Sequence, residues 1–172
     1  MDLYLVRHAI AEPRDAERWP DDASRPLTEN GAKLFRAAAR GLRSLGIEVE
    51  TVFASSYARA WQTAEILHAE ARWPSPTECQ ALEPGTPALR ALAAVDGRGM
   101  ASLALVGHEP QLSMIASLVL TGSPETASLE LKKGGVVYLR ADDALAPAAG
   151  TLRWSASPKM LRRLGRGTST SD

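Results

Sequence analysis

Short apolar runs that alternate with helical segments constrain the fold of this chain more than any other feature. Residues 3–6 and 102–106 are apolar and rich in strand formers, which predicts two buried strands. Between them, apolar residues recur at helical spacing from Leu34 to Leu45, after a predicted helix N-cap at Thr28. This alternation predicts an α/β fold, a three-layer α/β/α sandwich around a mainly parallel sheet.

The other segments extend the same pattern. Residues 13–26 are polar and rich in proline, which predicts a loop. Two late strands, joined by a turn or bulge at 132–135, predict an antiparallel element at one edge of the sheet. A single domain is expected at 1–158, followed by a flexible tail at 159–172. The remaining expected elements are strands at 49–55, 77–82, 128–131, 136–139 and 152–154, and helices at 58–71, 87–95 and 111–120.

Length and charge exclude several function classes. The chain has 172 residues, which suits one ordinary domain, and its 20 Lys and Arg residues balance its 20 Asp and Glu residues. This neutrality argues against a dedicated nucleic-acid binder and against a polybasic membrane surface. The N-terminal apolar run is neither a signal peptide nor a membrane span. Since the lone Cys79 permits no intramolecular disulfide, a cytoplasmic location is expected.

The residues that follow the expected strands carry the chemistry. In open α/β sheets, ligands bind beyond the carboxyl ends of the strands. Those ends deliver Arg7 with His8, then Arg59 at the start of a helix, and then His108. Two guanidinium groups that converge on one point are costly without an anion between them, and their planar fork suits phosphate. A helix N-terminus near Arg59 would add backbone donors, so the implied ligand is a phosphoryl group.

A phosphoryl ligand gives each histidine a role. A neutral histidine can attack phosphorus and carry it as a phosphohistidine. The second histidine, if protonated, can donate to an equatorial oxygen and stabilise charge in the transition state. A metal site built from His8 and His108 is not expected, because the neighbouring arginines would repel a cation and no helical His-Glu-x-x-His spacing appears. No cofactor is expected either.

Three segments resemble motifs of the histidine phosphatase superfamily, which has the phosphoglycerate mutase-like fold. Residues 5–9 resemble its Arg-His-Gly signature, with Ala9 in place of the usual glycine. Residues 55–64 resemble its second phosphate-binding arginine segment, and residues 106–108 its second-histidine segment. Within the superfamily, the chain is most similar to the small bacterial phosphohistidine phosphatases of the SixA type. That similarity rests on Ala9, on Arg-Pro-Leu-Thr at 25–28 and on Gly-His-Glu-Pro at 107–110.

The resemblance implies a role for each matching residue. His8 would be the nucleophile. Arg7, Arg59 and His108 would form the phosphate pocket, and Arg25 would help to line the site. By itself, each of these residues also fits an ordinary structural role, such as a polar strand end or a solvated helix position. Their joint order and spacing favour the functional interpretation.

The proton donor and the substrate are further expectations. Superfamily members with a clear general acid carry Glu or Asp after the third strand, which implies Glu83, with Glu12 and Glu109 as alternatives. The expected enzyme is a metal-independent phosphatase that acts on phosphohistidine in a protein, because a chain this short has no large insertion to cover the site. The alternatives are a phosphomonoesterase for a small phosphoester and, in another class, an inactive phosphate-binding regulatory module.

Overall fold

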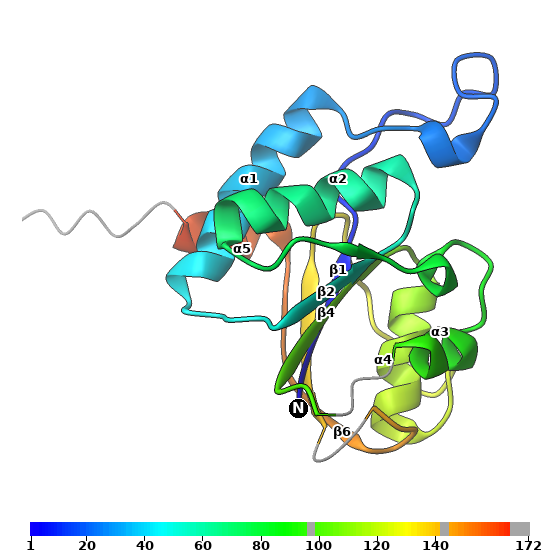
Figure 1. Ribbon diagram of the computed structural model, residues 1–172, viewed down its shortest axis with the longest axis vertical. Coiled ribbons are helices and arrows are strands. Elements are labelled where there is room, and N and C mark those ends of the chain that lie inside the picture. Colours follow the sequence, from blue (N-terminus) through cyan, green and yellow to red (C-terminus); the bar gives the residue numbers. More distant parts are fainter. Residues whose placement is uncertain (96–98, 142–144, 166–172) are drawn as a thin grey trace, which may run out of the picture.

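A six-stranded mixed sheet forms the centre of the molecule (Figure 1). The computed structural model describes residues 1–95, 99–141 and 145–165. The strand order is β3-β2-β4-β1-β5-β6, with the first four strands parallel and β5 antiparallel to both β1 and β6. The expected mainly parallel sheet with an antiparallel edge is therefore confirmed. The strands are β1 Asp2–Arg7, β2 Thr51–Ala54, β3 Thr77–Glu78, β4 Ser102–Gly107, β5 Val136–Ala141 and β6 Gly150–Ala156.

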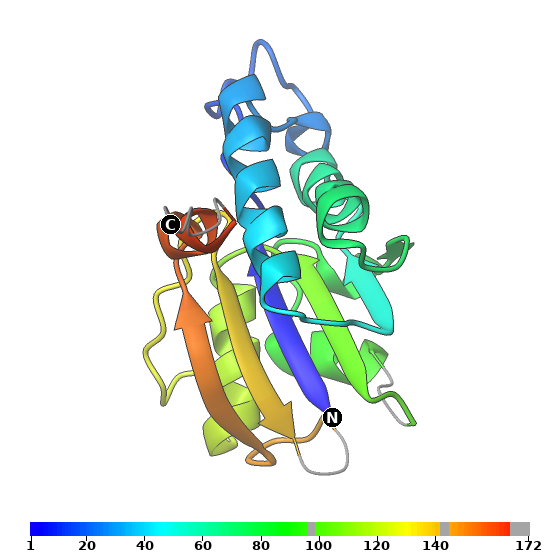
Figure 2. The ribbon, with the colours of Figure 1, turned by 90° about the vertical axis from the view of Figure 1, so that its left-hand side faces the viewer.

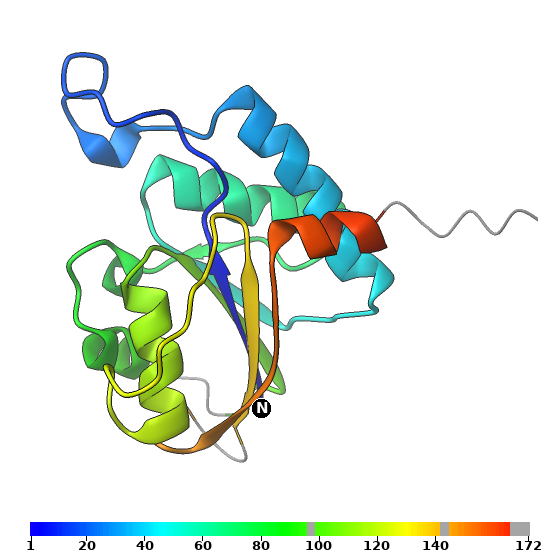
Figure 3. The same ribbon diagram turned by 180° about the vertical axis from the view of Figure 1, so that it is seen from behind.

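Helices cover both faces of the sheet, so the expected three layers are present (Figures 1 and 3). On one face lie α1 (Glu29–Ser44), α2 (Ala58–Ile66) and α5 (Pro158–Leu164). A π-helical turn, Leu67–Ala71, extends α2. On the other face lie α3 (Ala88–Ala94) and α4 (Gln111–Thr121). Two apolar clusters separated by the sheet form the core.

Local signals explain where several elements begin. The Thr28 hydroxyl accepts a hydrogen bond from the Gly31 amide, which confirms the predicted cap of α1. A strand expected at 128–131 is wrong, since these residues form no strand. The segment instead packs beneath α4, where the carbonyl of Leu129 accepts a hydrogen bond from Ser113. The antiparallel partner of β5 is β6, whose central residues the sequence predicted as an edge strand.

The expectation of a tail from residue 159 is also wrong over residues 159–165. Ser157 caps α5, and Pro158 occupies the first turn of that helix. Leu161 is fully buried, and α5 lies against α1 at Gly41, where a Cβ atom would collide with the Leu161 carbonyl oxygen (Figure 2). The ordered fold therefore continues through α5. The rest of the expected tail, 166–172, lies outside the described residues.

The register of the parallel strands brings three chain segments to one edge. Arg7 at the end of β1 pairs with Gly107 at the end of β4, and Ala54 at the end of β2 pairs with Val106. The next residues remain tied to the sheet, because the His8 amide donates to the Gly107 carbonyl at 3.0 Å. This carboxyl edge is the place at which ligands bind in open α/β sheets.

Candidate active site

His8 lies directly after β1 and is 7% exposed. Its Nδ1 lies 2.7 Å from the Ala9 carbonyl oxygen, which can only accept, so Nδ1 carries the proton and Nε2 keeps its lone pair. Burial lowers the pKa of the ring to about 4, and the positive charges of Arg59, Arg7 and Lys133 add to this effect. His8 is therefore neutral at pH 7, as a nucleophile must be.

His108 follows β4 and faces His8 across the sheet edge, with 5.1 Å between ring centroids. Its Nε2 lies 3.0 Å from the Ser55 hydroxyl, and Tyr57 packs edge-on against the ring. The pKa of His108 is lowered to about 3, mainly by burial. The neighbouring His8 and the charge of Arg59 lower it further. The protonated form considered from the sequence is thus disfavoured while no anion is bound. A neutral ring still carries one N–H donor.

Arg7 and Arg59 are both held by oxygen acceptors at their terminal nitrogens. Arg7 donates from Nη1 to the Leu131 carbonyl at 2.8 Å. Arg59, 4% exposed, donates from Nη1 and Nη2 to Asp22 and packs over the Tyr57 ring. In both arginines, Nε is buried and has no hydrogen-bond partner among the described residues. An unpartnered buried donor is unfavourable, and two of them beside a neutral histidine suit an oxyanion.

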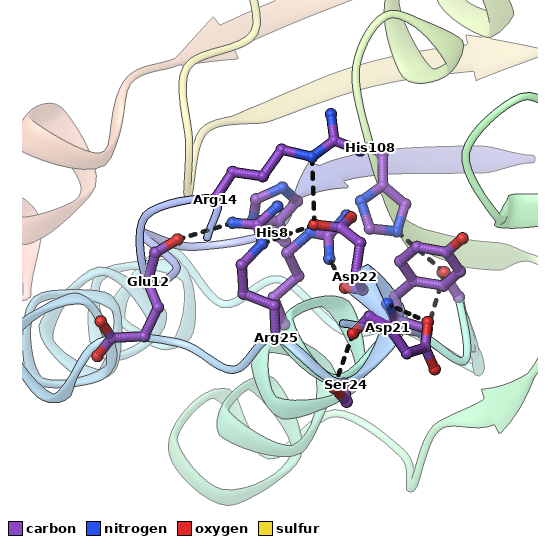
Figure 4. Close-up of polar contacts among 12 residues, drawn as sticks. His8, Glu12, Arg14, Asp21, Asp22, Ser24, Arg25 and His108 are labelled. Carbon is purple, nitrogen blue, oxygen red and sulfur yellow. Dashed lines mark hydrogen bonds and ion pairs between the residues drawn. The ribbon is translucent and has the colours of Figure 1, made fainter. Parts of the chain in front are cut away.

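Asp22 joins the loop before α1 to the arginines, and the sequence reasoning missed it (Figure 4). One carboxylate oxygen accepts from Arg59 Nη2 at 3.0 Å and the other from Arg25 Nε at 2.8 Å. Arg14 approaches the same carboxylate at 3.8 Å. Arg25 also donates to the main-chain oxygen of Glu12 at 2.7 Å. The structure thus brings Arg25 to the site through Asp22, a residue without a distinctive local motif.

Thr63 of α2 ties the segment after His8 to the helix that carries Arg59. Its hydroxyl accepts from the Ala9 amide at 3.0 Å and donates to the Arg59 carbonyl at 2.7 Å. Thr63 is fully buried, so each of these bonds is shielded from water. Thr63 lies four residues after Arg59, one helical turn away, and that spacing was the available sequence signal.

The three candidate acids lie in different surroundings. Glu83 follows the 3-10 turn Gln80–Leu82 and accepts a hydrogen bond from the Ser56 hydroxyl at 2.6 Å. The Glu12 carboxylate lies 3.7 Å from Arg18, in the loop. Burial raises the pKa of the Glu109 carboxyl, and the charge of Arg7 opposes that rise. No contact between these carboxylates and either histidine is present among the hydrogen bonds of the described ranges.

Two further observations limit the chemistry in the described part of the chain. Its His, Cys, Asp and Glu residues form no group of three that could hold a metal ion. None of its helices combines the length and the apolar character needed to cross a bilayer. The residues at the sheet edge suit an oxyanion-binding site: two cationic side chains with unpartnered Nε donors lie beside a neutral imidazole that has an available lone pair.

The sequence is similar to known proteins over most of its length. A model of the histidine phosphatase superfamily (branch 1) matches residues 3–83, the part that carries the nucleophile candidate and all the clustered arginines. An uncharacterised protein of Picosynechococcus sp. is 37% identical over 147 residues, which cover 84% of this chain and 87% of that protein. Phosphohistidine phosphatase SixA of Escherichia coli is 29% identical over 166 residues, covering 94% of this chain and 97% of that one.

The three-dimensional similarity is equally extensive. The solved structure of the protein histidine phosphatase SixA complexed with tungstate matches with a TM-score of 0.79 and 26% identity, covering 92% of this chain and 98% of that one. The putative SixA of Nakamurella multipartitia matches with a TM-score of 0.74 and 25% identity, covering 91% and 95%. The similarity therefore includes the part of the chain after residue 83, where His108 lies.

Proposed function

Because the chain belongs to the histidine phosphatase superfamily, and is a phosphatase of that superfamily, we propose that it hydrolyses phosphohistidine on a protein through a phosphorylated His8. The observation that carries the catalytic part is the state of His8: a buried, neutral ring whose Nδ1 proton is held by the Ala9 carbonyl and whose Nε2 is available. A cytoplasmic location, expected from the lone Cys79, is part of the same proposal.

The proposed reaction has two steps. First, His8 Nε2 attacks phosphorus, a P–Nε2 bond forms, and the P–N or P–O bond to the leaving group breaks as that group takes a proton. Second, water attacks the phosphohistidine, the P–Nε2 bond breaks, and inorganic phosphate leaves. The Nδ1–H bond to the Ala9 carbonyl fixes the ring orientation in both steps.

Charge stabilisation comes from the residues around His8. The Nε groups of Arg7 and Arg59, unpartnered in the described part of the chain, would donate to the equatorial oxygens of the phosphoryl group. His108 would add one donor as a neutral ring. An anion in the pocket would favour the protonated form, which would then donate more strongly. Catalysis would rest on positioning and electrostatics.

Glu83 is the proposed proton donor for leaving groups that need one. It follows β3 on the carboxyl side of the sheet, and Ser56, the neighbour of the Ser55 that contacts His108, holds its carboxylate. A phosphoramidate places less demand on this acid, because its leaving nitrogen departs readily once protonated. That difference supports phosphohistidine as the substrate, as does the similarity to SixA phosphohistidine phosphatases.

A substrate panel tests both parts of the proposal. The wild-type protein and His8→Ala would be assayed on a phosphohistidine protein or peptide, an aryl phosphate, sugar phosphates and nucleotides. We expect the highest kcat/KM on phosphohistidine and a loss of at least about 1,000-fold in His8→Ala on every substrate. A clear preference for a metabolite would replace the substrate proposal by a phosphomonoesterase. Equal activity without His8 would overturn the nucleophile assignment.

A further inference from the structure

The guanidinium group of Arg59 is held at one edge and free at the other. Its terminal nitrogens Nη1 and Nη2 donate to the main-chain oxygen and the carboxylate of Asp22, at 2.8 and 3.0 Å. Its Nε is buried without a partner in the described residues. A guanidinium binds an oxyanion through two parallel N–H groups, and Nε with the remaining hydrogen of Nη2 forms such a pair. Asp22 therefore occupies the edge that a phosphoryl group does not need.

The same carboxylate also fixes Arg25. Asp22 Oδ1 accepts from Arg25 Nε at 2.8 Å, while Oδ2 accepts from Arg59 Nη2. Two guanidinium groups thus share one carboxylate, and the trio keeps a net positive charge. Arg14, at 3.8 Å and with its side chain 84% exposed, adds little to this arrangement. Without the Asp22 carboxylate, the two cations would repel each other, and Arg59 would keep only the main-chain oxygen of residue 22 as a partner.

Arg7 shows a similar mode of attachment. One terminal nitrogen is held by the Leu131 carbonyl, and Nε is buried and unpartnered within the described ranges. The edge left free is again Nε with Nη2. Asp22 thus does for Arg59, through its carboxylate and its main-chain oxygen, what the Leu131 carbonyl does for Arg7: it holds the terminal nitrogens and leaves Nε without a partner in the described residues.

We propose that Asp22 is a positioning residue of the phosphate pocket, which holds Arg59 and Arg25 so that the Nε edge of Arg59 meets the phosphoryl oxygens. The inference rests on the proposed function, since it concerns the same site. It differs from the view that Asp22 competes with the substrate for the arginines, because a competitor would cover the Nε edge.

Asp22→Asn, Asp22→Ala and the control Asp21→Asn test this role. In Asp22→Asn the side-chain amide could accept from only one of the two arginines, and in Asp22→Ala the side chain could accept from neither. Asp21 is the adjacent exposed residue. Within the described residues, its carboxylate caps the 3-10 turn Asp22–Ser24 and makes no other side-chain bond, and an asparagine also caps such a turn. The readouts are phosphate and tungstate affinity by calorimetry, kcat and KM on an aryl phosphate, the thermal unfolding midpoint, and the NMR signal of Arg59 Nε–H.

We expect phosphate to bind about tenfold more weakly to Asp22→Asn and more weakly still to Asp22→Ala, with KM rising in parallel. Asp21→Asn should stay within about twofold of wild type. In the wild type, phosphate should shift the Arg59 Nε–H signal, and that shift should be reduced in both Asp22 variants. If Asp22→Ala does not fold, the same comparison is made with Asp22→Asn alone.

Three results would overturn the inference. Tighter phosphate binding by Asp22→Asn would show competition, and unchanged binding with a lower unfolding midpoint would show a purely structural role. A wild type that binds no phosphate would overturn both this inference and the proposed function. Phosphate binding that depends on Asp22, in a wild type that shows no turnover, would overturn the proposed function alone. The affinity measurements are repeated in the His8→Ala background, where binding is measured apart from turnover.

Discussion

The site has two halves that are held in place by different means. Arg7 ends β1, and His8 and His108 follow β1 and β4. The strand register places all three at one edge, and the backbone bond from His8 to Gly107 continues that register. The other half belongs to the loop between β1 and α1, where Asp22 and Arg25 depend on side-chain bonds (Figure 4). The strand half is fixed by the sheet as a whole, whereas the loop half is fixed by a few contacts that single substitutions can remove.

The largest expected effect is the difference between Arg59→Ala and Arg25→Ala in the loss of kcat/KM. Arg59→Ala removes a nearly buried cation with a free Nε donor, and we expect kcat/KM to fall by about 100- to 1,000-fold. Arg25→Ala removes a cation whose Nε and Nη1 are already engaged, and we expect a fall of about tenfold. Steady-state kinetics on an aryl phosphate measure both. Equal losses would mean that Arg25, in the loop half, binds substrate as directly as Arg59 of α2.

Sequence reasoning predicted the strand half and only part of the loop half, for a physical reason. A residue that follows a buried strand is placed by the parallel sheet, so Arg7, His8 and His108 could be assigned to one edge from their positions alone. Asp22 lies in a polar loop with several acidic residues that the sequence does not distinguish. Only the folded loop shows that Asp22 is the one that contacts the arginines. Its partner Arg25 was inferred through the family resemblance and not through geometry.

The errors in the predicted fold have similar causes. Residues 128–131 have strand-like composition, but pairing with β1 and β6 already occupies both sides of β5. Helix α5 carries the Ser-Pro start signal at 157–158, which the Arg- and Gly-rich composition of the following residues obscured. Local composition therefore failed where long-range packing or a short capping signal decided the structure.

The candidate acids give the next comparison. We expect Glu83→Gln to lower kcat by about 100-fold on phosphate esters with poor leaving groups, and by much less on a phosphoramidate or a nitrophenyl ester. Glu109→Gln is the matched control, since Glu109 also follows a strand end, and burial raises the pKa of its carboxyl. The ratio of rates on good and poor leaving groups is the measurement. A leaving-group dependence that appears only in Glu109→Gln would assign the proton donor to Glu109.

The pH dependence tests the electrostatics of the strand half. In the proposed mechanism His8 attacks as a neutral ring, and its pKa lies at about 4 because of burial and of the charges of Arg59, Arg7 and Lys133. The rate of the first step should therefore be level from neutral pH down to about pH 5 and fall about tenfold per unit below about pH 4.

The lowered pKa of His8 also predicts how the free energy of unfolding changes with pH. Between its ordinary pKa of 6.5 and about 4, His8 binds a proton in the unfolded chain but not in the native one. Its contribution to the free energy of unfolding is therefore full above pH 6.5 and declines as the pH falls towards 4. Chemical denaturation of wild type and His8→Ala at several pH values measures this difference. Parallel pH profiles for the two proteins would contradict the low native pKa.

The smallest expected effect on activity concerns Thr63, which links the nucleophile segment to the helix of Arg59. Thr63→Val keeps the shape of the side chain but leaves the buried Ala9 amide without its acceptor, so we expect a loss of about 1–3 kcal/mol in the free energy of unfolding. Because the sheet still places His8, kcat should fall only about two- to fivefold. Thr121→Val is the matched control, since its hydroxyl makes the same bond to the preceding helical turn far along the chain in α4. A loss of activity in Thr63→Val as large as that in Arg59→Ala would mean that the strand register alone does not position His8, and that the hydroxyl joining the Ala9 amide to the Arg59 helix is needed as well.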